Sequence, residues 1–279
     1  MRNFLIAQLA GLILFVPTSW GEFQVNTRTP YGQTYPDVAV DGKGKYVIAW
    51  RSYRQDGSSG GIYFQRLDTA GQPLGEETQV NTETGGDQTE PAVSSNSEGT
   101  FVVAWHGPGP NDVDVFARLF DPNGEPLSGE FCVNDVAEGT QRYPRVAMRD
   151  DGSFVVVWQN ELAGVNPYDR AGSFRIFDAQ GLAIGQATQF SGDFDCRYPD
   201  VATDGAGNFV VAWMQDKGAN SIQIRQYDDV GAAVTDPCKV SDVYFTSVTK
   251  PRVAMNHRGT FVVVWDGHGE YASEDDIHA

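Results

Sequence analysis

Hydrophobic and polar positions alternate in short runs along most of this chain, and one such pattern occurs five times. Each copy starts with Pro-x-Val and Ala or Ser, passes a Gly-bearing turn, and ends in aromatic-Val-(Val/Ile)-(Ala/Val)-Trp. The copies cover residues 36–50, 91–105, 144–158, 199–213 and 251–265, with Pro and Trp always 14 positions apart. A period of two, rich in β-branched and aromatic residues and bounded by Gly, Asp and Pro, predicts strands rather than helices.

Each repeat predicts four strands, which in the first copy are residues 36–40, 46–50, 62–67 and 78–81. Tandem four-stranded antiparallel units of this length are typical of an all-β fold, the β-propeller, in which each unit is one blade. A β-sandwich is the alternative, but it does not explain the strict tandem repetition.

The two ends of the repeat region suggest how the ring closes. Residues 23–26 have the pattern of a fourth strand, and residues 275–279 align with the third strand that begins at Val113. We therefore expect five blades, at approximately 36–81, 91–134, 144–191, 199–241 and 251–279, with residues 23–26 pairing with the last blade. A chain truncated from a larger propeller is the alternative.

Residues 1–21 have the pattern of an export signal. Arg2 is followed by an apolar run over residues 4–16, and small residues stand before a cleavage point at Gly21. The run is shorter than the roughly 20 apolar residues that a membrane-spanning helix needs, and Gln8 interrupts it. We expect residues 22–279 to form a single propeller domain that is secreted or lies at the cell surface, with the periplasm as the alternative.

The chain is acidic, with a formal net charge of −17. Such a surface repels nucleic-acid phosphates and anionic lipid, so neither is an expected partner, whereas a glycan or an extracellular protein is compatible. Cys132, Cys196 and Cys238 occupy different places in the repeat, so at most one internal disulfide can form, and its pairing stays open.

Four Asp-x-x-Gly turns join the predicted third and fourth strands, at residues 68–71, 121–124, 178–181 and 228–231. Asp accepting backbone N–H bonds and Gly at positive φ are tight-hairpin chemistry, which we favour over calcium loops. No cofactor is expected. The carboxylate-rich loops are compatible with calcium, and the candidate ligands are Asp56, Asp112 and Asp114. The alternative is that these side chains are solvated at the tips of their loops.

Residues beside each repeat Pro enter the innermost strand from the face with the variable loops, so they should ring the mouth of the central channel. Tyrosines beside mixed charges are suited to hold a sugar by stacking and hydrogen bonding. A ring of charge pairs that only fills the channel is the alternative. The repeat Trp residues are predicted to pack between blades. The candidate ligand-binding residues are Tyr35, Asp37, Tyr143, Arg145, Tyr198, Asp200 and Arg252.

A catalytic alternative places two carboxylates across a glycosidic bond, drawn from Asp37, Glu90 and Asp200. Arg145 and Arg252 occupy equivalent positions, and we expect them to pair with these acids and keep their pKa low, which is the opposite of what a general acid needs.

The segments Val-Asn-Thr, Gln-x-x-Pro-x-Val-Ala, Gly-x-Phe-Val-Val-x-Trp and Arg-(Leu/Ile)-Phe-Asp-x-x-Gly resemble a tandem repeat of large secreted and surface-attached bacterial proteins, many of them adhesin-like. The resemblance covers nearly all of residues 23–279, implies an extracellular binding role and transfers no catalytic residue. We therefore expect a non-catalytic binding or adhesion module. The alternatives are a glycoside hydrolase or lyase with carboxylates at the channel mouth, and a structural fragment of a larger adhesin.

Overall fold

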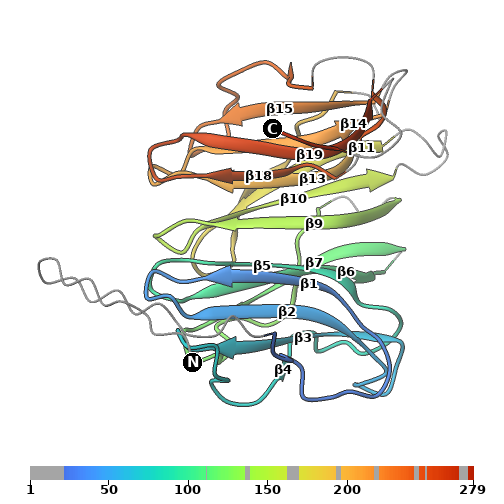
Figure 1. Ribbon diagram of the computed structural model, residues 1–279, viewed down its shortest axis with the longest axis vertical. Coiled ribbons are helices and arrows are strands. Elements are labelled where there is room, and N and C mark those ends of the chain that lie inside the picture. The colour runs from blue at the N-terminus through green and yellow to red at the C-terminus, as the bar shows by residue number, and fades with distance from the viewer. Residues whose placement is uncertain are drawn as a thin grey trace, which may run out of the picture.

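The computed structural model describes residues 22–110, 112–135, 139–161, 170–192, 196–216, 220–241, 245–248, 250–269 and 276–279. The expected export signal lies outside these residues. Over the described chain the fold is all-β, with its strands in five four-stranded antiparallel sheets (Figure 1). This confirms the all-β class and the assignment of one sheet to each repeat.

The first four sheets keep their strands in sequence order. Sheet one holds β1 (Gln33–Val40), β2 (Tyr46–Tyr53), β3 (Gly60–Leu67) and β4 (Thr78–Gln79). Sheet two holds β5 (Thr89–Ser95), β6 (Phe101–Pro108), β7 (Val113–Phe120) and β8 (Phe131–Cys132). Sheet three holds β9 (Thr140–Met148), β10 (Phe154–Glu161), β11 (Arg170–Phe177) and β12 (Ala183–Gln189). Sheet four holds β13 (Cys196–Thr203), β14 (Phe209–Gln215), β15 (Ser221–Tyr227) and β16 (Cys238–Lys239).

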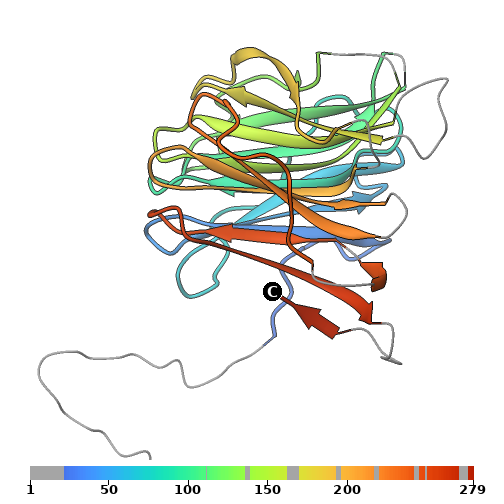
Figure 2. The same cartoon turned by 90° about the horizontal axis from the view of Figure 1, so that it is seen from above.

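Sheet five holds β17 (Phe245–Val248), β18 (Arg252–Met255), β19 (Phe261–Gly269) and β20 (Asp276–His278). Its innermost strand is divided into two parts, β17 and β18, on either side of Pro251. Both parts pair with β19, one after the other. β20 pairs with β19 at the outer edge of the sheet (Figure 2). Within the described residues, sheet five thus has the first three strand positions of a repeat and no fourth.

The core lies between consecutive sheets, because alternate residues of each strand point to opposite neighbours. On β6, Val103 and Trp105 pack in the cluster shared with sheet one, whereas Val102 and Ala104 pack in the cluster shared with sheet three. Equivalent clusters join sheet three to four and four to five. The five repeat Trp side chains expose at most 6 % of their surface. Those of sheets two to five pack against the preceding sheet, as predicted, whereas Trp50 lies on the outer face of sheet one beside the N-terminal segment.

The Asp-x-x-Gly turns are hairpins, as predicted. In the first of them, Asp68 Oδ1 accepts hydrogen bonds from the backbone N–H groups of Ala70 and Gln72, and Gly71 has φ of 78°. The turns at Asp121, Asp178 and Asp228 repeat both bonds. Side-chain acceptance and a left-handed Gly account for this spacing without an ion.

The predicted closure of the ring is not formed in this structure. None of the core clusters among the described residues joins sheet five to sheet one. The outward faces of these two sheets expose apolar side chains, with Val38 and Val40 more than half exposed on sheet one and Val262 and Ile277 on sheet five. The five sheets therefore form an open arc.

The N-terminal segment nevertheless lies where a preceding blade would place its fourth strand. Val25 lines a cavity with Ile48 and Trp50 on the outer face of sheet one. The backbone N–H of Thr27 donates to Glu77, as that of Thr82 donates to Glu130 one sheet further on. The segment thus repeats toward sheet one the contacts that residues 80–82 make with sheet two.

No helix in the described part of the chain has the length and hydropathy to cross a bilayer. Cys132 and Cys238 are exposed free thiols on β8 and β16, whereas Cys196 is fully buried in the cluster between sheets three and four.

Candidate functional site

The innermost strands β1, β5, β9, β13 and β18 lie side by side, so the residues where they begin converge at one end of a channel. Each of the first four carries an irregularity in its register at the residue before the repeat Pro. That residue has a left-handed φ of 50–55° although it is not Gly. Strained backbone of this kind concentrates at functional sites, where a bulge redirects a side chain. The four residues are Tyr35, Glu90, Tyr143 and Tyr198.

Three of these four residues meet at a small cavity that is also lined by Arg145, Lys250 and Arg252. The rings of Tyr143 and Tyr198 meet edge to face with 5.1 Å between their centroids. Lys250 Nζ lies 4.8 Å from the centroid of Tyr198 and 6.0 Å from that of Tyr143. The ammonium group is held against the electron-rich ring faces. Side chains from sheets two to five therefore build one cationic, aromatic site.

We call this site the channel mouth. Within it, Arg145 interacts electrostatically with four other charged residues. Burial is the main cause that lowers its pKa, the neighbouring guanidinium lowers it further, and three carboxylates oppose the shift. The neighbouring guanidinium is that of Arg252, and the carboxylates are Asp200, Asp37 and Glu90. The structure thus brings together the charged residues that the sequence places beside the repeat Pro.

Asp37 and Asp200 hold neighbouring sheets together. Asp37 Oδ2 accepts a 2.8 Å hydrogen bond from the backbone N–H of Val93, and Asp200 Oδ2 accepts one of the same length from Val253. Arg145 Nε lies 3.9 Å from Asp200 Oδ1. Burial raises the pKa of Asp200, even though two guanidinium groups and two backbone N–H groups lower it. The expectation that arginine pairing keeps this pKa low is therefore wrong for Asp200, because desolvation is the larger effect.

His106 packs against Tyr143 of the channel mouth, and it was not among the residues predicted from the sequence. It is 6 % exposed, and its ring meets Tyr143 with 5.9 Å between centroids. Burial, with a smaller effect of Arg142, lowers its pKa to about 3, so the imidazole is neutral. Its position directly after the repeat residue Trp105 is the only signal in the sequence.

The remaining candidates lie apart from the channel mouth. Tyr35 is 48 % exposed on β1 and does not line the cavity. Asp56 accepts from the backbone N–H of Ser58, Asp112 from the hydroxyl of Thr140, and the buried Asp114 from the side chain of Asn134. Among the described residues, no group of three or more His, Cys, Asp or Glu side chains is placed to hold a metal ion.

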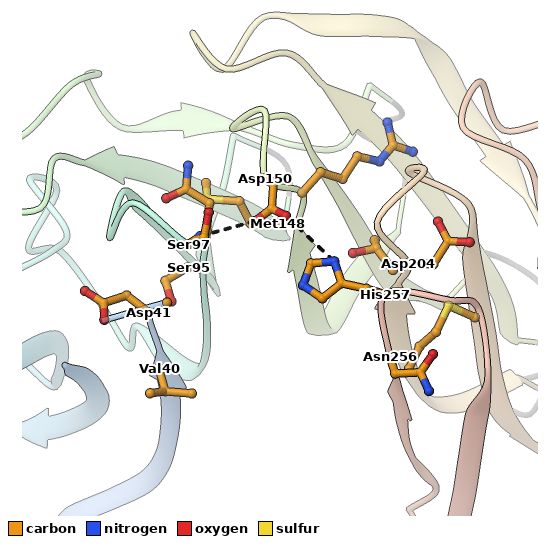
Figure 3. A pocket seen from close by; sticks show the side chains of 14 residues that line it. Val40, Asp41, Ser95, Ser97, Met148, Asp150, Asp204, Asn256 and His257 are labelled. Carbon is orange, nitrogen blue, oxygen red and sulfur yellow. Dashed lines mark hydrogen bonds and ion pairs between the residues drawn. The ribbon is translucent and has the colours of Figure 1, made fainter. Parts of the chain in front are cut away.

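A larger cavity of about 340 Å³ lies at the other end of the channel, among the turns between first and second strands (Figure 3). The carboxylates that line it form hydrogen bonds within and between the turns. Asp41 Oδ1 accepts hydrogen bonds from the backbone N–H groups of Lys43 and Lys45. Asp150 accepts from the Ser97 N–H and lies 3.8 Å from His257 Nδ1.

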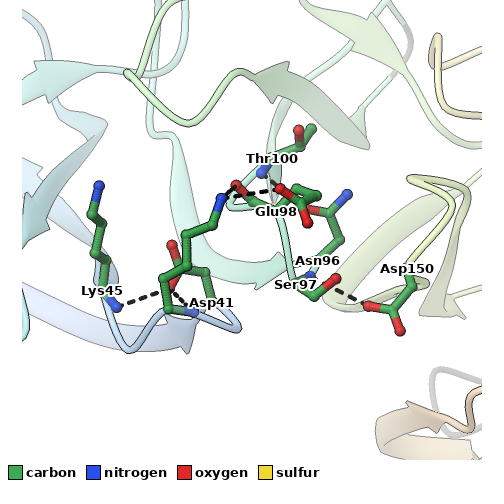
Figure 4. A network of polar contacts seen from close by, with 8 residues as sticks. Asp41, Lys45, Asn96, Ser97, Glu98, Thr100 and Asp150 are labelled. Carbon is green, nitrogen blue, oxygen red and sulfur yellow. Dashed lines mark hydrogen bonds and ion pairs between the residues drawn. The ribbon is translucent and has the colours of Figure 1, made fainter.

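The polar network in Figure 4 continues these turn-to-turn contacts, with Lys43 Nζ 3.0 Å from Glu98. This cavity is larger than the channel mouth, but its polar groups are engaged in joining adjacent turns. We therefore place the candidate site at the channel mouth, where strained residues, aromatic rings and cations converge.

Comparison with known proteins shows the fold. No protein-family model matches the chain, and no curated protein matches it significantly. A protein of unknown function from Dyadobacter fermentans is similar with a TM-score of 0.61 and 12 % identity, over 84 % of this chain and 75 % of that one. An endo-arabinase from Bacteroides thetaiotaomicron has a TM-score of 0.52 and 12 % identity, over 87 % and 92 %. The polysaccharide lyase ulvan lyase has a TM-score of 0.53 and 11 % identity, over 87 % and 68 %.

These neighbours support a propeller-type fold and correct the functional expectation. The expectation of a non-catalytic binding or adhesion module is contradicted, because the structural neighbours with a named activity are enzymes that act on sugars. Identities of 11–12 % show the fold alone, so the activity has to be argued from the site itself.

Proposed function

We propose that this protein is a carbohydrate-active enzyme that cleaves glycan chains at the channel mouth. The observation that carries the proposal is the cavity formed by Glu90, Tyr143, Arg145, Tyr198, Lys250 and Arg252. It combines proton-transferring groups, cations and aromatic rings that come from four separate sheets. The similar fold of an endo-arabinase and of a polysaccharide lyase supports the proposal.

Tyr143 is the proton donor in this proposal. Burial, the neighbouring Tyr198 and the charge of Glu90 raise the pKa of its hydroxyl, so Tyr143 keeps its proton at neutral pH. A protonated hydroxyl can protonate the glycosidic oxygen as the bond breaks. The buried His106 packs edge-on against the ring and fixes its position.

Glu90 is the proton acceptor. It lines the same cavity, is only partly buried, and is held by strained backbone with φ of 50°. A carboxylate in this place is accessible to substrate, in contrast to the buried Asp200.

Hydrolysis with Asp200 as the general acid is an alternative to cleavage by Tyr143 and Glu90, and the environment of Asp200 favours it. Burial raises the pKa of Asp200, which is the property of a general acid in a glycosidase. Its Oδ2 is engaged with the Val253 N–H, so only Oδ1 faces Arg145 and the site. Asp37 or Glu90 would then be the second carboxylate.

The test is to incubate the folded chain with a panel of polysaccharides and to measure new reducing ends. We expect cleavage of at least one polymer, and a loss of about 10²-fold or more in Tyr143→Phe and Glu90→Gln. Tyr46→Phe, on the exposed outer face of sheet one, is the matched control and should keep full activity. No cleavage by folded protein, or equal rates in all variants, would refute the proposal.

The proposed architecture is a five-bladed ring closed by residues 23–26 as the fourth strand of sheet five. Its support is the seating of Val25 against Ile48 and Trp50, together with the open edge of β20. Export of the chain, with residues 1–21 as its signal, is likewise proposed and places the enzyme where polymeric glycans occur.

A further inference from the structure

We propose that the substrate is an anionic polysaccharide whose units carry a uronate carboxylate, and that the chain is cut by β-elimination. The inference rests on the proposed function and names its substrate class and reaction. It follows from the three cations that line the channel mouth of a chain that is acidic as a whole.

The formal net charge of the chain is −17, yet three of the residues that line this small cavity are Arg145, Lys250 and Arg252. Arg145 and Arg252 are close enough for each charge to act on the other, since Arg252 lowers the pKa of Arg145. Lys250 and Arg252 are exposed to solvent, whereas Arg145 is partly buried beside them. Like charges gathered in this way repel one another, and an anionic ligand offsets that repulsion.

The three cations differ in how far the protein offsets their charge. Asp200, Asp37 and Glu90 act on Arg145, and the charge of Arg252 acts on Asp200 as well. Among the described residues no carboxylate forms an ion pair with Lys250 or Arg252, and the distance from Arg145 Nε to Asp200 Oδ1 is 3.9 Å. Lys250 instead lies over the rings of Tyr198 and Tyr143. A planar carboxylate is the ligand that guanidinium donors bind in a bidentate way. A neutral sugar offers these cations hydrogen-bond acceptors but no opposite charge.

The same groups account for an elimination. When the cations bind the uronate carboxylate, they stabilise the negative charge that develops as the C5–H bond breaks. Glu90 accepts that proton, the electron pair forms the C4–C5 double bond, and the bond from C4 to the glycosidic oxygen breaks. Tyr143 donates its proton to the departing oxygen, which becomes a hydroxyl. The products are a new chain end and an unsaturated uronate, with no oxidant, reductant or water consumed.

The proposal is tested by measuring two reaction products, new reducing ends and the C4–C5 double bond, on two groups of polymers. Polygalacturonate, alginate and hyaluronan form the anionic group, and arabinan, xylan and a β-glucan form the neutral group. New reducing ends report any cleavage, whereas ultraviolet absorbance of the C4–C5 double bond reports elimination alone. We expect both signals on an anionic polymer and neither on the neutral group.

Lys250→Met should lower elimination and the retardation of the protein in gels that contain polygalacturonate, each by about tenfold or more. Lys45→Met, on the opposite face, is the control and should change neither. Cleavage of neutral polymers only would overturn this inference and leave the proposed function standing. Reducing ends from a uronate polymer without the double bond would overturn elimination in favour of hydrolysis, and no cleavage at all would overturn both proposals.

Discussion

The carboxylate of Asp200, on β13, accepts the backbone N–H of Val253, on β18, over 2.8 Å. Asp37 and Val93 form the same bond between sheets one and two, again at 2.8 Å. In both cases the acid follows the repeat Pro directly, and the donor is two residues after the next repeat Pro. The position beside the Pro therefore joins consecutive sheets as well as facing the channel.

Removing either carboxylate should destabilise the fold. Asp200→Ala leaves the Val253 N–H without its acceptor, so we expect a loss of about 1.5–3 kcal/mol in the free energy of unfolding. Asp37→Ala should cost less, because Asp37 is only partly buried. Urea denaturation measures both, and the exposed Asp236→Ala is the control. A change within about 0.5 kcal/mol for Asp200→Ala would contradict this role.

Asp200 should also give the stability a recognisable pH dependence. Burial raises its pKa in the folded state, so the folded chain binds more protons than the unfolded chain between the ordinary pKa of Asp and the raised one. Its contribution is therefore fully present below the ordinary pKa and is lost as pH rises through the folded pKa. We expect the stability of the wild type relative to Asp200→Asn to fall as pH rises through this window. Chemical denaturation over a pH series tests this, and a constant difference would contradict it.

His106 should give the free energy of unfolding the opposite pH dependence, with stability falling as the pH is lowered. Burial lowers its pKa from 6.5 to about 3, so the unfolded chain binds a proton that the folded chain excludes between these values. Stability should fall by up to about 1.4 kcal/mol for each pH unit below 6.5, down to about pH 3. His106→Phe keeps an aromatic ring against Tyr143 and removes the titration. Its unfolding free energy should therefore depend less on acid than that of the wild type, and an identical pH profile would show that His106 is not buried in solution.

Ring closure can be tested by a cross-link. By the register in which Val80 bonds to Ile62, closure would place Val25 opposite Ile277. A Val25→Cys and Ile277→Cys double variant should then form a disulfide under mild oxidation and show a raised Tm. Either single variant is the control for disulfides that involve Cys132, Cys196 or Cys238. If the double variant cross-links no more than the single ones, the arc is open in solution.

The position of each element was predictable because its causes are local. Period-two alternation, the residue before Pro and the Asp-x-x-Gly turns all act over a few residues, so the repeat alone predicted one four-stranded sheet for each copy. The burial of the five Trp side chains followed in the same way, since each ends an apolar strand.

Closure and chemistry depended on contacts that sequence spacing does not define. Whether sheet five meets sheet one depends on the summed rotation between four pairs of sheets, and no core cluster of the described residues joins these two sheets. The pKa of Asp200 was predicted in the wrong direction, because pairing with arginine is visible in the sequence whereas desolvation is not. His106 was missed because only packing places it behind Tyr143.

The sequence by itself determined that this chain is a tandem array of four-stranded sheets whose Pro-flanking residues line a channel. The tertiary structure decided which of those residues meet. It left Tyr35 exposed, engaged Asp37 and Asp200 with backbone N–H groups, and gathered Tyr143, Tyr198 and Lys250. The physical reason is that strand pattern follows from local periodicity, whereas burial and charge at a site follow from side chains that separate repeats bring within a few ångströms of one another.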